Sequence, residues 1–280
     1  MSERAFILGA GRVGTALARA MRAAGINVVG LHGRRAQAEP DAISAGPLPP
    51  ALSRATVVIV AVRDPQLEGA LGELARASLA RGAVVLFVSG SAEPAALAEL
   101  RAAGHPCGTF HPLLPFADPA QSAIAVRTAW FGLDGDPEAR AMGKSLAAAL
   151  GAHTLEIPAG DKVRYHAAAV MVSNFPALLM DAGEQLLRAI GLAPDDARAA
   201  LLPLFAAAAE NVKARPSAQA LTGPLARGDV ETVRKHLAAL APTPALQDFY
   251  VALSRAAIPL ARAAGTDPAR LAEIGALIDR

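Results

Sequence analysis

The stretch Ala5-Phe-Ile-Leu-Gly-Ala-Gly-Arg-Val-Gly14 decides how the first half of this chain folds. Its apolar run, residues 5–8, predicts a β-strand, and residues 15–24 predict a helix. A glycine-rich turn between a strand and a helix is typical of a β–α–β unit, from which parallel sheets are built. We therefore expect strands and helices to alternate in the residues that follow.

The glycines of this turn, Gly9, Gly11 and Gly14, have the spacing G-x-G-x-x-G. In a dinucleotide-binding turn the first permits a tight turn, the second lets the backbone approach a pyrophosphate, and the third lets the helix pack closely on the strand. Arg12 and Val13 would present N–H groups and the positive end of the helix dipole to the phosphates. An ordinary glycine-rich turn is the alternative, but the flanking strand and helix favour nucleotide binding.

Strands alternate with helices as far as residue 157. The predicted strands cover residues 27–31, 56–62, 83–88, 107–110, 128–133 and 153–157. The predicted helices between them include residues 67–79, 95–103 and 137–150. This alternation predicts an α/β domain over residues 1–157, with a mostly parallel sheet that helices cover on both faces.

From residue 159 onward the strand signal stops. Helical segments are predicted over residues 161–190, 194–213, 230–240, 244–264 and 268–278. Glycine and proline residues separate these segments. We therefore predict a second, all-α domain over residues 158–280.

The composition argues against several classes of protein. The 27 lysine and arginine residues nearly balance the 25 acidic ones, and no run of like charges indicates a nucleic-acid or membrane surface. Cys107 is the single cysteine, so we expect no disulfide within the chain and no metal site. The sequence shows no signal-peptide pattern, and its most apolar later stretch, residues 166–180, is too short to span a bilayer. We expect a cytoplasmic protein, and the apolar fraction of 53% suits a compact chain with an oligomer interface.

The end of the second predicted strand indicates which dinucleotide binds. An NAD-binding unit carries an acidic residue there, which bonds the ribose 2′-hydroxyl. This chain has Arg34 and Arg35 instead, and guanidinium groups bind phosphate through paired hydrogen bonds. We predict NADP(H); the alternative, two solvated arginines in a loop, does not account for the missing acid.

Four residues follow strands of the predicted sheet, at the edge where ligands of open α/β sheets bind. Ala61, Arg63, Ser89 and His111 are therefore expected around the nicotinamide end of the cofactor. Ser89 either contacts ribose or substrate or simply caps a turn before a helix. The sequence supports both interpretations equally.

The helix predicted to begin near residue 161 carries the best candidates for chemistry. At 100° per residue, Lys162, Tyr165, His166, Ala169 and Ser173 share about a third of its circumference. Reduction of a carbonyl or imine by hydride needs a proton donor and a positive group near the developing negative charge, and a lysine and a histidine can supply both. The alternatives are a solvated lysine and a histidine satisfied in the core.

A polar loop is predicted over residues 221–229. Thr222 and Arg227 are expected to hold a carboxylate of the substrate, the arginine through its forked donors. Asp229 is expected to cap the next helix. His236 either lines the same cleft or lies on the surface or in the core.

The motifs together resemble a known bacterial family. The matching pieces are residues 9–14, 88–90, 110–113, 131–132, 135–136, 165–166, 173–174, 221–224 and 227–229. The N-terminal half is similar to the NADP-binding domain of pyrroline-5-carboxylate reductase, ketopantoate reductase and deazaflavin-dependent NADP oxidoreductases. The whole chain resembles a family with a Rossmann domain joined to a helical domain of unknown function. The resemblance implies an NADP-dependent oxidoreductase that forms a homodimer through its helical domain.

Ketopantoate reductases use a lysine and a downstream asparagine on the first long helix of the second domain. Lys162 and Asn174 are similar to these residues in kind and general location. The resemblance implies that Asn174 binds substrate. Our first hypothesis is an NADPH-dependent reductase of a small, anionic carbonyl or imine compound, such as a ketopantoate-like 2-oxo acid. Lys162, His166 and His111 are its candidate catalytic residues.

Two other functions stay open at this point. A protein that senses the redox state of NADP without catalysis would bind the cofactor and have no use for Lys162 and His166. A methyltransferase also has a glycine-rich loop after its first strand. It would need an acidic residue at the end of the second strand, and Arg34 and Arg35 argue against it.

Overall fold

The computed structural model describes residues 3–38, 40–93 and 95–279. The chain divides into two compact units, Met1–Asn174 and Phe175–Arg280. The division expected after residue 157 differs from this one by helix α6 (Lys162–Ser173), which the first unit includes. Helix α6 belongs there because the side chain of Lys162 is buried and Tyr165 bonds to a strand residue of the sheet.

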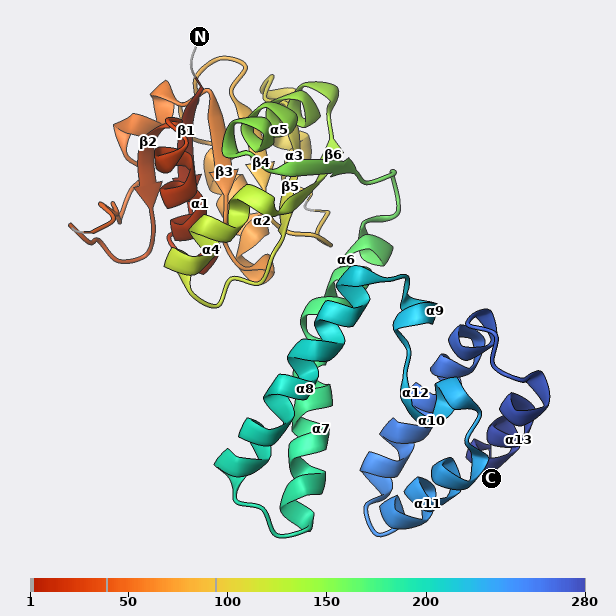
Figure 1. Cartoon of the computed structure of the whole chain (residues 1–280). Coiled ribbons are helices and arrows are strands. Elements are labelled where there is room, and N and C mark those ends of the chain that lie inside the picture. The colour runs from red at the N-terminus through yellow and green to blue at the C-terminus, as the bar shows by residue number, and fades with distance from the viewer. Residues whose placement is uncertain (1–2, 39, 94, 280) are drawn as a thin grey trace. The chain divides into compact units, whose positions relative to one another are not determined.

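The first unit contains a seven-stranded sheet in the order β2-β1-β3-β4-β5-β6-β7 (Figure 1). The strands are β1 (Arg4–Leu8), β2 (Asn27–His32), β3 (Val57–Val60), β4 (Val84–Phe87), β5 (Cys107–Leu113), β6 (Trp130–Gly135) and β7 (His153–Glu156). All neighbouring pairs are parallel except β5 and β6. The predicted mostly parallel sheet is thus confirmed.

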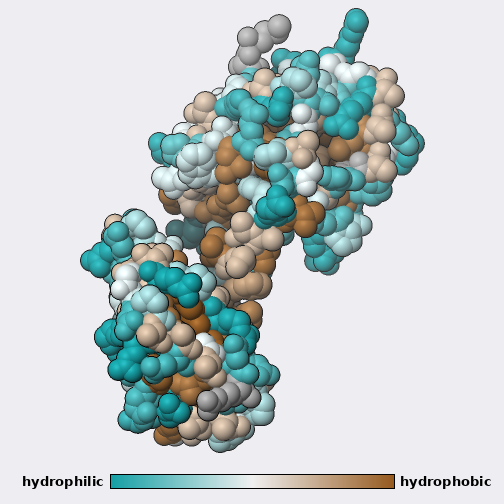
Figure 2. Space-filling model, turned by 90° about the vertical axis from the view of Figure 1, so that its right-hand side faces the viewer, coloured by the Kyte–Doolittle hydropathy of each residue, from teal (hydrophilic) through white to brown (hydrophobic). Residues whose placement is uncertain are grey.

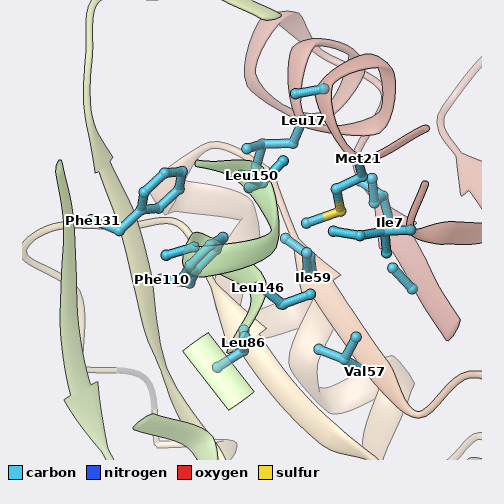
Figure 3. Packing of buried hydrophobic residues seen from close by; sticks show 14 of the residues in the cluster. Ile7, Leu17, Met21, Val57, Ile59, Leu86, Phe110, Phe131, Leu146 and Leu150 are labelled. Atoms are coloured by element: carbon cyan, nitrogen blue, oxygen red, sulfur yellow. The ribbon is translucent and has the colours of Figure 1, made fainter. Parts of the chain in front are cut away.

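Helices cover both faces of this sheet. They are α1 (Arg12–Ala23), α2 (Asp64–Ala75), α3 (Leu97–Ala102), α4 (Pro119–Ala125) and α5 (Pro137–Leu150), with short 3₁₀ turns at Pro50–Arg54 and Val126–Thr128. On one face, side chains of α1 and α5 pack on the strands around Ile7, Ile59 and Phe110 (Figure 3). On the other face, α2 and α3 pack around a second cluster that includes Phe87. The strands are therefore buried on both sides, which explains their nearly continuous apolar sequences.

The second unit is all-α, as predicted. Its helices are α7 (Phe175–Ala189), α8 (Pro194–Ala214), α9 (Ser217–Ala220), α10 (Gly223–Arg227), α11 (Val230–Leu240), α12 (Pro244–Ala263) and α13 (Pro268–Ile278). A small core of Val230, Val233, Ile274 and Ile278 holds α11 and α13 together. Among the described residues, none of the helices combines the length and the apolar character needed to cross a membrane.

Two local predictions were wrong. The helix expected over residues 161–190 is split at Asn174 into α6 and α7, because in a continuous helix Pro176 would have no N–H for the carbonyl oxygen of Val172 and its ring would clash with that carbonyl. The polar loop expected over residues 221–229 contains helix α10. Pro224 occupies its first turn, where a missing N–H costs nothing, and Gly228 ends it in the left-handed conformation.

Candidate functional site

The glycine turn has the geometry that its spacing predicted. Gly9 has a φ of 114°, and a Cβ there would overlap the carbonyl group of Ala61. A Cβ on Gly14 would overlap the carbonyl oxygen of Gly9, so the helix touches the end of the strand. A Cβ on Gly11 would meet nothing within 4 Å. Gly11 therefore stands on the open side, where a ligand can approach the backbone.

Helix α1 begins directly after this turn, with Arg12 exposed and Val13 half-buried. No side chain in the described part of the chain caps its N-terminus, and no acidic residue occupies its first turn. The N–H groups at this end and its positive dipole are thus available to an anion. A pyrophosphate fits these requirements.

The segment after β2 lies against the glycine turn. A Cβ on Gly33 would come within 2.7 Å of the Cβ of Ala10. Arg34 and Arg35 follow at once and are exposed. Together with Arg12 they place guanidinium groups on both segments that border this corner of the sheet.

The nearest acidic residue after β2 whose position is described is already paired. Asp41 is buried, and Arg19 of α1 donates to it from Nη2 at 2.6 Å and from Nε at 3.0 Å. Nη1 of Arg22 lies 3.6 Å from the same carboxylate. The carboxylate fastens the loop after β2 to α1, so its oxygens are not left free for a ribose hydroxyl.

The ends of β3 and β4 supply mainly backbone to the site. Ala61 is buried beside the glycine turn, and Arg63 is exposed just before α2. Ser89 is buried, and its Oγ accepts hydrogen bonds from the N–H of Ala92 at 3.0 Å and of Ser91 at 3.4 Å. Ser89 therefore caps the turn after β4, which is the second of the two interpretations given above.

Three aromatic side chains meet at the far end of β5. Nδ1 of His111 lies 2.8 Å from the hydroxyl oxygen of Tyr165 on α6. The ring centroid of His166 lies 5.9 Å from that of His111. Two glycines make room for this cluster. A Cβ on Gly90 would come within 2.9 Å of the His111 ring, and one on Gly132 would overlap the Tyr165 hydroxyl.

Burial keeps both partners of the His111–Tyr165 pair neutral at pH 7. Burial, with smaller contributions from His166 and Lys162 that Asp64 partly opposes, lowers the pKa of His111 to about 4. Burial also raises the pKa of the Tyr165 phenol. The pair is therefore a neutral imidazole hydrogen-bonded to a neutral phenol, and one ring nitrogen of His111 is left for another partner.

Lys162 lies on the same helix but has other neighbours. Its side chain is only 2% exposed, so the solvated lysine considered above is wrong. Nζ donates to the carbonyl oxygen of Ala92 at 2.5 Å and lies 4.6 Å from the centroid of the Phe87 ring. Burial lowers the pKa of this ammonium, while Asp134, Glu93 and Asp64 raise it.

The remaining candidates have surface positions. Asn174 is exposed, and its Oδ1 accepts from the Ser173 hydroxyl at 2.7 Å. Thr222 precedes α10 and Arg227 ends it, both exposed in the second unit. Their expected contact with a carboxylate stays a prediction.

Two further side chains of the second unit have clear partners. Asp229 accepts from the N–H of Thr232 at 3.1 Å and caps α11, as predicted. His236 is exposed, and its Nδ1 lies 3.0 Å from the hydroxyl oxygen of Tyr250. His236 therefore lies on the surface of its unit, one of the placements left open above.

Sequence reasoning missed the role of Tyr165 as the partner of His111, and of Gly90 and Gly132 as the space for their rings. A signal was present in the sequence: an isolated glycine within a strand often marks a close approach of another group. Gly132 lies within β6 and marks the place of Tyr165. The partner itself is 54 residues from His111, and no local pattern connects them.

A mostly parallel sheet with this glycine turn, an uncapped helix N-terminus and polar residues at the carboxyl edge defines a domain of the Rossmann type. The comparison with protein families agrees. Residues 4–112 match the Rossmann-like domain, and residues 129–257 match DUF2520, a domain of unknown function. This chain thus combines a Rossmann-like domain with a DUF2520 domain.

Several solved structures share this fold over nearly the whole chain. A Bacteroides fragilis protein described as a "putative NADP oxidoreductase" is 24% identical, with a TM-score of 0.70 and 91% of this chain and 97% of that one covered. Plasmodium falciparum pyrroline carboxylate reductase with NADP bound is 13% identical, with a TM-score of 0.59 and 98% of both chains covered. The Aspergillus terreus reductive aminase in complex with NADPH and ethyl levulinate is 19% identical, with a TM-score of 0.59 and 100% and 93% covered. The comparison with curated proteins gave no match.

The burial of His111 predicts a pH dependence of stability. Because its pKa is lower in the folded protein, about 4, than the ordinary value of 6.5, the unfolded chain binds the extra proton between these values. The free energy of unfolding is therefore complete above pH 6.5 and falls as the pH drops toward 4. Between pH 7 and pH 5, the free energy of unfolding measured with urea should fall less for His111→Gln than for the unchanged protein.

His153→Gln is the matched control, because that ring is exposed on Trp130. It should lose as much stability between the two pH values as the unchanged protein does. An equal loss in all three proteins would contradict the assignment of His111 as a buried neutral imidazole.

Proposed function

We propose that this chain is an NADPH-dependent reductase of a small carbonyl or imine compound. The observation that carries the proposal is the neutral His111–Tyr165 pair at the edge of the sheet where Rossmann-type domains bind their ligands. The glycine turn for a pyrophosphate belongs to the same unit. The names of two structural neighbours, a pyrroline carboxylate reductase with NADP and a reductive aminase with NADPH, support this class of reaction.

The cofactor preference follows from the corner formed by the glycine turn and the segment after β2. Arg12, Arg34 and Arg35 are exposed there, and the acidic residue that NAD would need is absent from the end of β2. A 2′-phosphate would gain charge-assisted hydrogen bonds from these guanidinium groups. Asp41, the nearest acidic residue after β2 whose position is described, is held by Arg19 of α1 and is not free to accept from a ribose hydroxyl.

In the proposed reaction, the cofactor supplies hydride to the carbon of the C=O or C=N bond. Tyr165 donates to Nδ1 of His111, which leaves the hydrogen on Nε2 to polarise the substrate oxygen or nitrogen. A neutral imidazole held in a low-pKa environment is suited to this role. His166, half-buried beside it, supplies the proton that completes a carbonyl reduction. Substrates with a carboxylate, such as 2-oxo acids, are the proposed class.

The cofactor assignment predicts a selective loss of NADPH affinity. In Arg34→Ala and Arg35→Ala proteins, the dissociation constant for NADPH should rise roughly tenfold or more, because each change removes charge-assisted hydrogen bonds to the 2′-phosphate. The constant for NADH should stay nearly unchanged. Calorimetric titration measures both constants. Arg81→Ala is the matched control, because Arg81 is exposed just before β4, at the amino end of that strand.

Equal affinities of the unchanged protein for NADH and NADPH would contradict the assignment of the arginines. S-Adenosylmethionine serves as a third ligand. Its binding in place of either dinucleotide would favour a methyltransferase.

The catalytic assignment predicts a loss of turnover without a loss of cofactor. NADPH oxidation is followed with a panel of 2-oxo acids and cyclic imines. For the substrate that reacts, His111→Asn should lower kcat by about 10²–10⁴, and Tyr165→Phe by a smaller factor because the ring of His111 stays in place. Affinity for NADPH should be unchanged in both.

The proton donor is tested with the same substrate. His166→Gln should slow a carbonyl substrate more than a preformed iminium, which needs no proton on its nitrogen. If no member of the panel reacts although NADPH binds, the non-catalytic sensor is favoured over the enzyme.

We further propose that the chain forms a homodimer through α7 and α8. No described residue of α7 is buried, and in α8 only Ala197 is. Large apolar side chains are exposed on them, namely Phe175, Leu178, Leu179, Leu186, Leu202, Leu204 and Val212. Hydrophobic residues are also visible on the face of the molecule shown in Figure 2. A large exposed apolar surface marks an interface. In a two-fold dimer the same surface of a second copy would cover it.

The dimer is tested by light scattering during size-exclusion chromatography. The unchanged chain should elute with twice the mass of 28.5 kDa. Leu179→Glu together with Leu202→Glu should elute as a monomer, because charges at an apolar interface are costly. Leu253→Glu, equally exposed on α12 but outside the pair of helices, should remain a dimer. A monomeric unchanged chain would contradict the proposal.

A further inference from the structure

Apart from the glycine turn and the His111–Tyr165 pair, the first unit contains a pocket on the face of the sheet that α3 covers. It has a volume of about 250 Å³. Strands β4, β5 and β6 form its floor, α3 one wall, and the side chain of Lys162 from α6 another. The lining residues are Phe87, Glu93, Leu97, Arg101, Gly108, Thr109, Asp134, Gly135 and Lys162. None of them belongs to the glycine turn or to the His111–Tyr165 pair.

One buried hydroxyl of this pocket has no partner. Thr109 is 1% exposed, and its Oγ1 forms no hydrogen bond with the described part of the chain. A buried polar group without a partner destabilises the fold, because it has lost its hydrogen bonds to water. Thr109 points to the same face of β5 as the pocket, so a bound molecule can satisfy it.

The positive charge of the pocket is only partly compensated. Within the described part of the chain, the ammonium group of Lys162 has one hydrogen bond, to the carbonyl oxygen of Ala92, although it can donate three. Arg101 is different, because its Nε donates to both carboxylate oxygens of Asp136. Arg101 is thus paired with a carboxylate, whereas Lys162 has no carboxylate within salt-bridge distance among the described residues and keeps donors for a ligand.

Two carboxylates of the pocket balance this cation. Asp134 accepts one hydrogen bond, from the N–H of Gly135 at 2.7 Å. Glu93 is exposed at the border of the pocket. Both line the same pocket as Lys162, and both raise the pKa of its ammonium group. The pocket thus presents both signs of charge within a space of small-molecule size.

We propose that this pocket binds a small zwitterion, an α-amino acid. The carboxylate of the ligand would accept from Lys162 and from the unpartnered hydroxyl of Thr109. Its ammonium group would donate to Asp134 and Glu93. A simple anion would be repelled by the two carboxylates, and a simple amine by Lys162, whereas a zwitterion satisfies all four groups. The site is separate from the proposed reductase chemistry, and its occupancy does not depend on it.

The experiment measures thermal stabilisation and calorimetric binding of the full chain with each of the twenty amino acids. Propionate and alaninamide are included because they lack the ammonium and the carboxylate of alanine, respectively. At least one amino acid should bind, and the two half-ligands should bind at least tenfold more weakly. Failure of all twenty to bind, or equally tight binding of propionate, would overturn the proposal.

Variants then locate the site. Thr109→Val removes one hydroxyl with no change of shape, and it should not lower stability, because that hydroxyl has no partner to lose. The dissociation constant for the amino acid should rise roughly tenfold in Thr109→Val, because one hydrogen bond to the ligand is lost. It should rise by a similar factor or more in Asp134→Asn. Thr154→Val, on β7 outside the pocket, is the matched control and should bind as the unchanged chain does. Unaltered binding in both pocket variants would overturn the proposal.

Discussion

Helix α1 and strand β1 approach each other so closely that residue 14 has no room for a side chain, since a Cβ there would overlap the carbonyl oxygen of Gly9. Gly9 in turn has a backbone conformation that other residues rarely adopt, and it lies against the carbonyl group of Ala61. Three backbone segments therefore meet at one point. Their contact directs the uncapped N-terminus of α1 over the carboxyl edge of the sheet, where the proposed cofactor binds.

Glycines also make room for the side chains of the proposed reaction, because they have no Cβ. Gly90 and Gly132 leave the space that the rings of His111 and Tyr165 occupy. The burial that results lowers the pKa of His111 to about 4. The imidazole is thereby kept neutral at physiological pH and suited to polarise a substrate rather than to pair with an anion.

Much of the first unit was predictable because its signals are local. The β-branched runs predicted buried strands, and the glycine spacing predicted the turn. His111 was placed at the correct edge because parallel strands all end on one side. The environment of Lys162 was not predictable, because its position on a helix face does not say which strand that face covers. Its burial against Phe87 and Ala92 depends on how α6 lies across the sheet. Likewise, residues 221–229 looked like a loop because the helix they form is only one turn long.

The sequence by itself determined the α/β and all-α halves, the glycine turn and the two arginines in place of an acidic residue at the end of β2. These features depend on backbone sterics and on the periodicity of short segments, which neighbouring residues control. Only the tertiary structure decided that Tyr165 is the partner of His111, that Asp41 is held by Arg19, and that Thr109 faces a pocket with an unused hydroxyl. Pairing and burial of this kind join residues far apart in the chain, because a side chain's charge and hydrogen bonds are set by whatever the fold packs against it.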